Sequence, residues 1–300
     1  MINILIILLL SIILTLIFVL YKYKQTINQF GQNTSRCFSS EKTLIQDLRK
    51  ALANQELSLV YQPIVDKQRD IISIESLLRW QHPHHGFIPP EQIIQMARQG
   101  EFINQLGEWI LKSACIQAAK WQKEILPTLG IAVNITPEQL TDPEFAKKVE
   151  KLLSDTELSA NTLELEITEQ VLIRDFKTTR MKLYQLKQLG VTISVDDFGT
   201  GYSSLGYIDK LPIDRIKIDK TFVMNINTGQ EQTVLILKSI FDLAKKLGLE
   251  VLAEGVETYN QFSLLSTHYC QRFQGYYFYK PLHPNEITNL LDKKTFQIKY

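Results

Sequence analysis

Short β-rich runs alternate with amphipathic stretches from Glu41 onward, and this rhythm limits the fold more than any other feature of the chain. A repeated strand-then-helix unit builds a parallel sheet with helical crossovers. About 260 residues with this repeat suit an α/β fold of the (β/α)8 TIM-barrel type better than an open sheet. The expected strands are 71–77, 131–135, 163–167, 191–195, 215–218 and 249–253, and the expected helices are 90–98, 107–124, 143–153, 178–189 and 232–247.

Each expected strand has an apolar face and a second face that ends in a polar or charged residue. Successive side chains of a strand point to opposite faces, so Ile193 and Val195 share one face while Ser194 and Asp196 share the other. In a barrel the second faces converge at the carboxyl-terminal mouth, where barrel enzymes hold their active sites. The residues expected to meet there are Glu75, Asn134, Glu166, Asp196, Lys217 and Glu254.

Two adjacent aspartates, Asp196 and Asp197, stand where the expected strand 191–195 runs into a glycine-containing loop. Carboxylates this close raise each other's pKa unless a cation neutralises them. An isolated pair of this kind is more often a helix cap or a turn. Its place among the other charged strand ends favours a cation site.

The expected mouth offers carboxylates, an amide and a lysine, without thiolate or imidazole. Such a donor set favours the hard cations Mg²⁺ or Mn²⁺ over zinc. Asp196 and Asp197 would hold two ions about 4 Å apart, the arrangement that clamps both oxygens of a phosphoryl transfer. We predict phosphoester hydrolysis, with Lys217 beside the attacking water and its pKa lowered by the cations. A plain ion pair of Lys217 with Asp219 or another carboxylate is the alternative.

Beyond these arguments, the chain resembles the EAL-domain cyclic di-GMP phosphodiesterases over residues 41–290. The signature tripeptide is present as Glu75-Ser76-Leu77. The other matching motifs are Tyr61-Gln62-Pro63-Ile64, Val133-Asn134-Ile135, Glu166-Ile167-Thr168-Glu169, Asp196 to Ser204, Lys217-Ile218-Asp219-Lys220, Ala253-Glu254-Gly255-Val256-Glu257 and Gln274-Gly275-Tyr276. A chance match of all these motifs in order is negligible.

The resemblance implies that the protein opens cyclic di-GMP to linear pGpG with two divalent cations. It implies that the first cation is held by Glu75, Asn134, Glu166 and Asp196, and the second by Asp196, Asp197 and Glu254. The implied catalytic residues are Glu75, Lys217, Glu254 and Gln274, and the implied substrate contacts are Gln62, Leu78, Arg79 and Gln274. Glu169, Asp219 and the loop Phe198 to Ser204 are implied to support the metal site and a homodimer.

Three residues depart from the family pattern. Ser76 replaces the usual alanine, Arg98 stands where glutamate is usual, and Gln271 stands where aspartate is usual. None is a metal ligand in the pattern, so we expect effects on local packing or regulation and not on the chemistry.

Two other groups of residues are weaker candidates for a site. His82, His84 and His85 stand among proline and glycine, which predicts a loop and not a second metal site. The aromatic run 276–279 is more typical of packing than of a stacking platform.

Composition narrows the partners and the compartment. A formal net charge of +1 gives no electrostatic indication of a nucleic-acid polymer as partner. The three cysteines, Cys37, Cys115 and Cys270, are odd in number and widely spaced, so they suggest neither a disulfide framework nor a zinc site. A reducing compartment is the simpler interpretation.

The segment from Ile2 to Leu20 contains no charged residue and would span about 28 Å as a helix, which is close to one bilayer core. It lacks the basic leading region and the small-residue cleavage site of a signal peptide. Positive charges follow it, at Lys22, Lys24 and Arg36, so we expect a single-pass anchor in the bacterial inner membrane with the remainder in the cytoplasm. Residues 1–24 are the expected anchor and flank, 25–40 a short polar linker, and 41–300 the EAL domain.

Two other functions remain open at this point. A receptor that binds cyclic di-GMP without hydrolysing it is the main alternative, although such receptors usually lack one or more ligands and this chain lacks none. A module that only binds other proteins would not place its carboxylates on one face of each strand.

Overall fold

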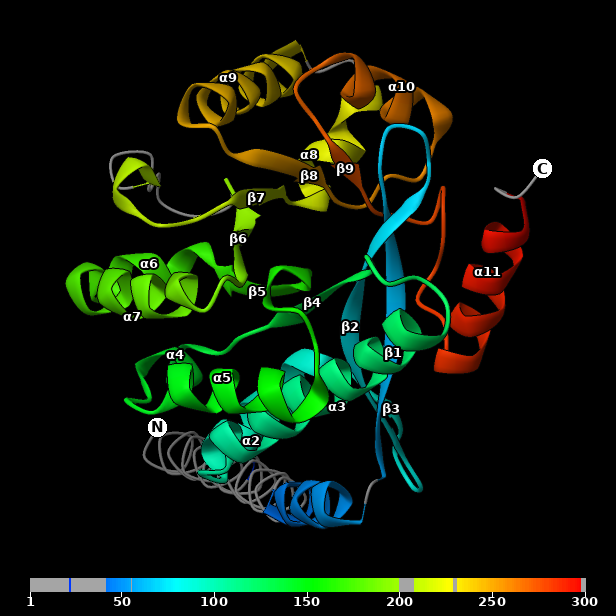
Figure 1. Ribbon diagram of the computed structural model, residues 1–300. Helices are drawn as coiled ribbons and strands as arrows, with labels where there is room; N and C mark the ends of the chain where they lie inside the picture. The colour runs from blue at the N-terminus through cyan, green and yellow to red at the C-terminus, as the bar shows by residue number, and fades with distance from the viewer. Residues whose placement is uncertain (1–21, 23–41, 55, 200–207, 229–230, 298–300) are drawn as a thin grey trace, which may run out of the picture.

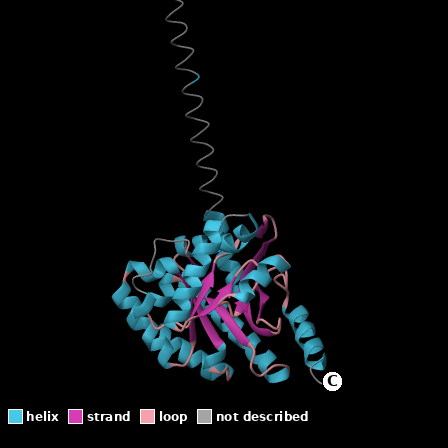
Figure 2. Ribbon diagram, turned by 90° about the horizontal axis from the view of Figure 1, so that it is seen from above, coloured by secondary structure: helices cyan, strands magenta, loops and turns pink. Residues whose placement is uncertain are grey.

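The structure, a computed structural model, describes residues 22, 42–54, 56–199, 208–228 and 231–297. Its centre is a closed ring of strands, and helices surround this ring (Figures 1 and 2). Around the ring the strands are β1 (Leu57–Val65), β9 (Arg272–Phe273), β8 (Glu250–Ala253), β7 (Arg215–Ile218), β6 (Thr192–Phe198), β5 (Leu163–Thr168), β4 (Gly130–Asn134) and β2 (Ile71–His82), and β2 pairs again with β1. The predicted barrel is therefore confirmed.

Among the strands of the ring, one breaks the expected parallel pattern. β1 runs antiparallel to both of its neighbours, β2 and β9, so the prediction of a wholly parallel sheet is wrong there. β1 was not among the expected strands because eight of its nine residues are buried, and it therefore lacks the alternation that marks a half-exposed strand. Its pairing with β2 sets Gln62 opposite Glu75.

The helices form an outer layer around the barrel (Figure 2). The first covers residues 42–53. The others are α2 (Pro90–Gln99), α3 (Ile103–Glu124), α4 (Pro137–Thr141), α5 (Phe145–Thr156), α6 (Glu169–Arg174), α7 (Phe176–Gln188), α8 (Lys220–Met224), α9 (Glu231–Leu247), α10 (Tyr259–Thr267) and α11 (Pro284–Gln297). A short strand, β3 (Gly86–Ile88), extends β2 as a hairpin.

A small apolar cluster inside the barrel supports the mouth. Ile64, Ala132 and Leu252 are fully buried and form a cluster separate from the main core between sheet and helices. Along each of these strands, the residue two positions nearer the mouth points to the same face. These residues are Gln62, which precedes Ile64 because β1 is antiparallel, Asn134 and Glu254. The polar side chains of the mouth therefore lie directly above this apolar layer of the barrel interior.

The opposite end of the barrel is filled by ion pairs. The Arg215 guanidinium contacts Glu164, and its Nη2 lies 2.5 Å from Glu250 Oε2. Arg272 Nε lies 3.0 Å from the same Glu250 oxygen. These pairs keep the start of strands β5, β7 and β8 together, far from the mouth.

Within the described ranges, no helix has both the length and the apolar character needed to cross a membrane. The apolar segment 2–20 and the linker 25–40 lie outside the described residues, so the anchor and the boundaries of the linker stay predictions.

Candidate active site

The six residues that strand alternation placed at the mouth lie together in the structure. Lys217, on β7, is at their centre with no exposed side-chain surface. Its Nζ lies 2.8 Å from Glu254 Oε1, 2.9 Å from Glu166 Oε2, 3.2 Å from Asp196 Oδ1 and 3.8 Å from Glu75 Oε1. The predicted alternative, an ion pair of Lys217 with a carboxylate, is thus also present. It involves four carboxylates, on β2, β5 and β6 and directly after β8.

Hydrogen bonds continue this cluster across the antiparallel pair. The Asn134 amide donates to Glu75 Oε1 at 2.9 Å, and Gln274 Nε2 donates to Glu75 Oε2 at 2.7 Å. The same Gln274 nitrogen lies 3.2 Å from Gln62 Oε1, and Gln62 Nε2 donates to the Tyr279 carbonyl at 3.0 Å. Glu75 and Gln274 are therefore held in place, and Gln62 is occupied by protein partners.

A bulge brings both aspartates to the mouth. Pairing of β6 with β7 runs from Val195 opposite Ile216 to Phe198 opposite Ile218, so β6 contains one extra residue. Asp197 has a φ of 55°, and its backbone N–H donates to Asp196 Oδ1 at 3.0 Å. Without the bulge, alternation would point Asp197 away from Asp196.

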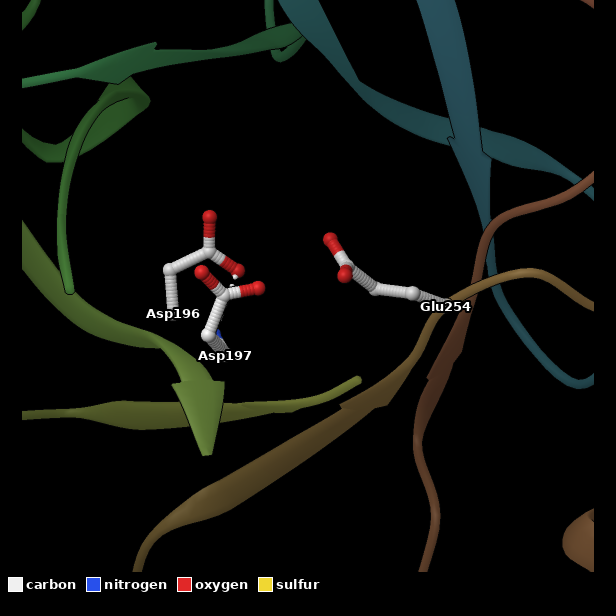
Figure 3. Close-up of side chains that lie close together, drawn as sticks. All are labelled: Asp196, Asp197 and Glu254. Carbon is white, nitrogen blue, oxygen red and sulfur yellow. Dashed lines mark hydrogen bonds between the residues drawn. The ribbon is translucent and has the colours of Figure 1, made fainter. Parts of the chain in front are cut away.

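Three carboxylates face one another as a result. One oxygen from each of Asp196, Asp197 and Glu254 lies within 4.8 Å of the others, and Figure 3 shows Glu254 reaching toward the two aspartates from the end of β8. In the described part of the chain this is the one group of three or more such residues at metal-binding spacing.

The crowding of like charges shifts the pKa of several groups. Burial, together with the charges of Glu75 and Asp196, raises the pKa of Glu166 well above its usual value, although Lys217 opposes this. Burial and Asp196 raise the pKa of Glu254 to about 8, and burial and Asp196 also raise the pKa of Asp197. Burial disfavours charged Lys217, but the surrounding carboxylates outweigh it and raise the pKa of Lys217. The predicted lowering of this pKa therefore depends on the charge of bound cations.

The donor set fits divalent cations. The carboxylates outnumber Lys217, their charged forms are disfavoured as they stand, and oxygen is the ligand that Mg²⁺ and Mn²⁺ prefer. The buried Glu166 Oε1 and Gln274 Oε1 atoms have no hydrogen-bond partner in the protein. Buried polar atoms are rarely left unsatisfied, and a bound cation would give the Glu166 oxygen a partner.

The predicted substrate contacts Arg79 and Leu78 lie on opposite faces of β2. Arg79 lies on the same face of β2 as Glu75, is half-buried, and donates from Nη1 to the Leu78 carbonyl at 2.7 Å. Leu78 lies on the other face, 7% exposed, within the hydrophobic core. The structure thus brings Arg79 and Gln62 to the mouth but not the Leu78 side chain.

The predicted supporting residues make local contacts beside the mouth. Glu169 is buried, and its Oε2 accepts the backbone N–H of Gly199 at 3.1 Å. Asp219 caps α8 by accepting the backbone N–H of Thr221 at 2.9 Å. Residues 200–204 of the predicted loop lie outside the described residues.

The three departures from the family pattern are accommodated locally. The Ser76 hydroxyl donates to the Ala132 carbonyl at 3.1 Å. Arg98 Nε lies 2.6 Å from Glu138 Oε1 on the surface, and Gln271 Oε1 accepts the Val251 N–H at 2.8 Å. None of these three side chains contacts the mouth carboxylates directly.

The histidine-rich segment is a turn, as predicted. His82 is buried and its Nδ1 accepts the backbone N–H groups of His84 and His85, at 3.1 and 3.2 Å. His82 Nε2 lies 3.6 Å from Asp47 Oδ2 on the first helix. This ring therefore fixes the β2–β3 hairpin. The sequence analysis did not predict this role of His82. It also did not predict the bulge at Asp197, whose only signal in the sequence is that two successive carboxylates must lie on one side of the strand.

Comparison with known proteins agrees with this geometry. The sequence model of the family described as the EAL domain matches residues 45–281. The chain belongs to the EAL domain family. The solved structure of the PaMucR phosphodiesterase in complex with cyclic di-GMP is 37% identical to this EAL domain, with a TM-score of 0.78, and the match covers 82% of this chain and 99% of that one. The EAL domain of Mycobacterium smegmatis DcpA is 32% identical, with a TM-score of 0.69, over 79% of this chain and 98% of that one.

Curated relatives are longer proteins. The cyclic di-GMP phosphodiesterase NbdA of Pseudomonas aeruginosa is 37% identical over 261 residues, which is 84% of this chain and 33% of that protein. An uncharacterized signaling protein of Caulobacter vibrioides is 39% identical over 278 residues, 90% of this chain and 33% of that protein. The chain thus spans about a third of the length of these relatives.

Proposed function

We propose that this EAL domain hydrolyses cyclic di-GMP to linear pGpG with two divalent cations, Mg²⁺ or Mn²⁺, and so lowers the concentration of this second messenger. The observation that carries the proposal is the group of Asp196, Asp197 and Glu254, whose carboxylate oxygens approach within 4.8 Å beside the buried Lys217. Relatives named for cyclic di-GMP hydrolysis, and one solved with cyclic di-GMP, support the substrate.

The side chains have separate tasks in this proposal. Glu75, Asn134, Glu166 and Asp196 would hold one cation, and Asp196, Asp197 and Glu254 the other. When bound, the cations supply positive charge for the phosphodiester and lower the pKa of a nearby water. Lys217, held at 2.8 to 3.8 Å from four of the carboxylates, orients that water and takes part in the transfer of its proton.

Two further side chains hold the reactants in position. Gln274 donates to Glu75 and, through its unpartnered Oε1, accepts a hydrogen bond from the attacking water, which orients that water. Arg79 presents a planar guanidinium on the same strand face as Glu75, and this group suits a phosphate oxygen pair. Both tasks are positioning tasks, so their loss is expected to lower turnover without unfolding the barrel.

The test is incubation of the full chain with cyclic di-GMP and Mg²⁺ or Mn²⁺, followed by chromatographic separation of the products. We expect pGpG to form, and Glu75→Ala to abolish its formation while circular dichroism stays unchanged. Binding of cyclic di-GMP by the folded, metal-loaded wild type without any pGpG would instead support the non-catalytic receptor.

We also propose that residues 2–20 anchor the protein in the bacterial inner membrane, with the EAL domain in the cytoplasm. The length of this uncharged segment and the positive charges after it support the proposal. Membrane fractionation is the test. Recovery of the chain in the soluble fraction would contradict it.

A homodimer is the third part of the proposal, and it rests on the likeness to the family. Light scattering on the purified chain is expected to give twice the monomer mass of 34.7 kDa after the contribution of detergent is subtracted. A single monomeric mass across the concentration range would contradict it.

A further inference from the structure

Phe87 is a large apolar residue that the fold leaves open beside the candidate active site. Its side chain is 55% exposed, although it belongs to the paired strand β3. The Arg79 guanidinium carbon lies 6.0 Å from the centre of the Phe87 ring. An isolated exposed phenylalanine needs no explanation, but one that is paired with a proposed phosphate-binding arginine does.

Strand alternation directs this ring toward the mouth. Phe87 lies opposite Gln81, while its neighbour Ile88 lies opposite Trp80 in the core. Directly paired residues point to the same face of a sheet, and Gln81, Arg79 and Glu75 share the odd-numbered face of β2. One face of this hairpin therefore carries, in order, a mouth carboxylate, a guanidinium about 13 Å further along the strand, and an aromatic ring beyond it.

The hairpin that presents Phe87 is held firmly. The buried His82 accepts two backbone N–H groups of the turn, and Gly86 takes the left-handed conformation, with a φ of 68°. Ile88 and Trp80 anchor the other face, at 3% and 1% exposure. A ring fixed in this way binds a flat partner with little loss of conformational freedom.

We propose that Phe87 is a substrate-binding residue that stacks against one purine base of the substrate while Arg79 holds a phosphate oxygen. This inference rests on the proposed function, since it assigns the substrate base to a place on the protein. Base stacking on an aromatic ring adds binding energy for every purine, and the guanidinium beneath adds a flat cationic neighbour. A cyclic dinucleotide whose scissile phosphate lies near Glu75 extends along this face toward the ring.

The test compares Phe87→Leu with Tyr184→Leu in the full chain. Tyr184 is a matched control because it is 46% exposed and has Arg180 at 5.5 Å from its ring centre, but it lies on the outer helix α7. We expect Phe87→Leu to raise KM for cyclic di-GMP about fivefold to fiftyfold with kcat within about twofold, and Tyr184→Leu to change neither. An unchanged KM in Phe87→Leu, or a loss confined to kcat, would overturn the inference.

A second pair of variants tests the stacking by tryptophan fluorescence and does not require hydrolysis of the substrate. Phe87→Trp is expected to keep KM within about twofold and to show quenched tryptophan emission when cyclic di-GMP binds, whereas Tyr184→Trp shows none. Binding of cyclic di-GMP by Phe87→Trp without quenching would overturn the inference alone. A wild type that neither binds nor hydrolyses cyclic di-GMP would overturn the proposed function, and this inference with it.

Discussion

The Nζ atom of Lys217 lies 2.9 Å from Glu166 Oε2, and neither side chain has any exposed surface. A buried ion pair is a weak source of stability, but removing one partner leaves the other charge uncompensated. Lys217 faces three more carboxylates, so its loss would leave several buried negative charges in the barrel without a positive partner.

Lys217→Met is accordingly expected to lose hydrolysis and to lower the free energy of unfolding, measured in EDTA, by about 3–5 kcal/mol. Addition of Mn²⁺ should restore part of that stability, because the ion replaces the missing positive charge. Urea unfolding with and without Mn²⁺ measures both effects. The control is Lys187→Met, which removes a surface pair with Asp214 at 2.8 Å and should cost no more than about 1 kcal/mol.

Ser76→Ala tests whether the departure at the signature tripeptide matters. The hydroxyl makes one buried hydrogen bond, to the Ala132 carbonyl at 3.1 Å, so we expect a loss of about 0.5–1.5 kcal/mol in stability. Turnover should stay within about twofold, because the hydroxyl touches none of the mouth residues. A tenfold fall in kcat would show that Ser76 acts on the chemistry.

Glu169→Ala tests the link between α6 and the start of the loop after β6. The carboxylate accepts the Gly199 N–H two residues beyond Asp197, so its loss should loosen the two aspartates that are proposed to hold cations. We expect the Mn²⁺ concentration for half-maximal activity to rise about tenfold, which corresponds to about 1.4 kcal/mol. Glu169→Gln, which keeps an acceptor oxygen, should recover most of the affinity, and equal effects of both variants would contradict this role.

The ion pairs at the far end of the barrel predict a pH effect. Burial disfavours charged Glu250, but hydrogen bonds and charge from Arg215 and Arg272 outweigh this and lower the pKa of Glu250 below its usual value. Such a group stabilises the fold above its ordinary pKa, and this contribution is lost as the pH falls through the folded-state pKa. Between about pH 5 and pH 3 the urea midpoint of the wild type should therefore fall more steeply than that of Glu250→Gln. Parallel curves would contradict the assignment.

Much of the site was predictable because strand alternation is a local property. Ile193, Val195 and Asp196 reveal their faces from the order of residues alone, and the same holds at the other strand ends. Once the sheet closes into a barrel, those strand ends lie together at one mouth. The parallel strands β2, β4, β5, β6, β7 and β8 were predicted for the same reason, since each has a distinct apolar run, whereas the two-residue β9 was not predicted.

The features of the site that were not predicted depend on pairing between segments that are distant in the sequence. The extra residue at Asp197 exists only relative to β7, so the only signal within β6 is the indirect one of two successive aspartates. β1 escaped prediction because burial on both faces removes its alternation, and the contact of Gln62 with Gln274 follows from that antiparallel strand. Leu78 was expected near substrate by resemblance, whereas its parity on β2 puts its side chain in the core.

The central claim is that two cations share Asp196 at this mouth, and counting bound Mn²⁺ by electron paramagnetic resonance tests it most directly. We predict two Mn²⁺ per wild-type chain with spin coupling between them, one Mn²⁺ in Asp197→Asn, and weakened binding of both ions, with the larger loss of cyclic di-GMP hydrolysis, in Asp196→Asn. A single Mn²⁺ in the wild type, or equal and mild losses in the two variants, would contradict the claim.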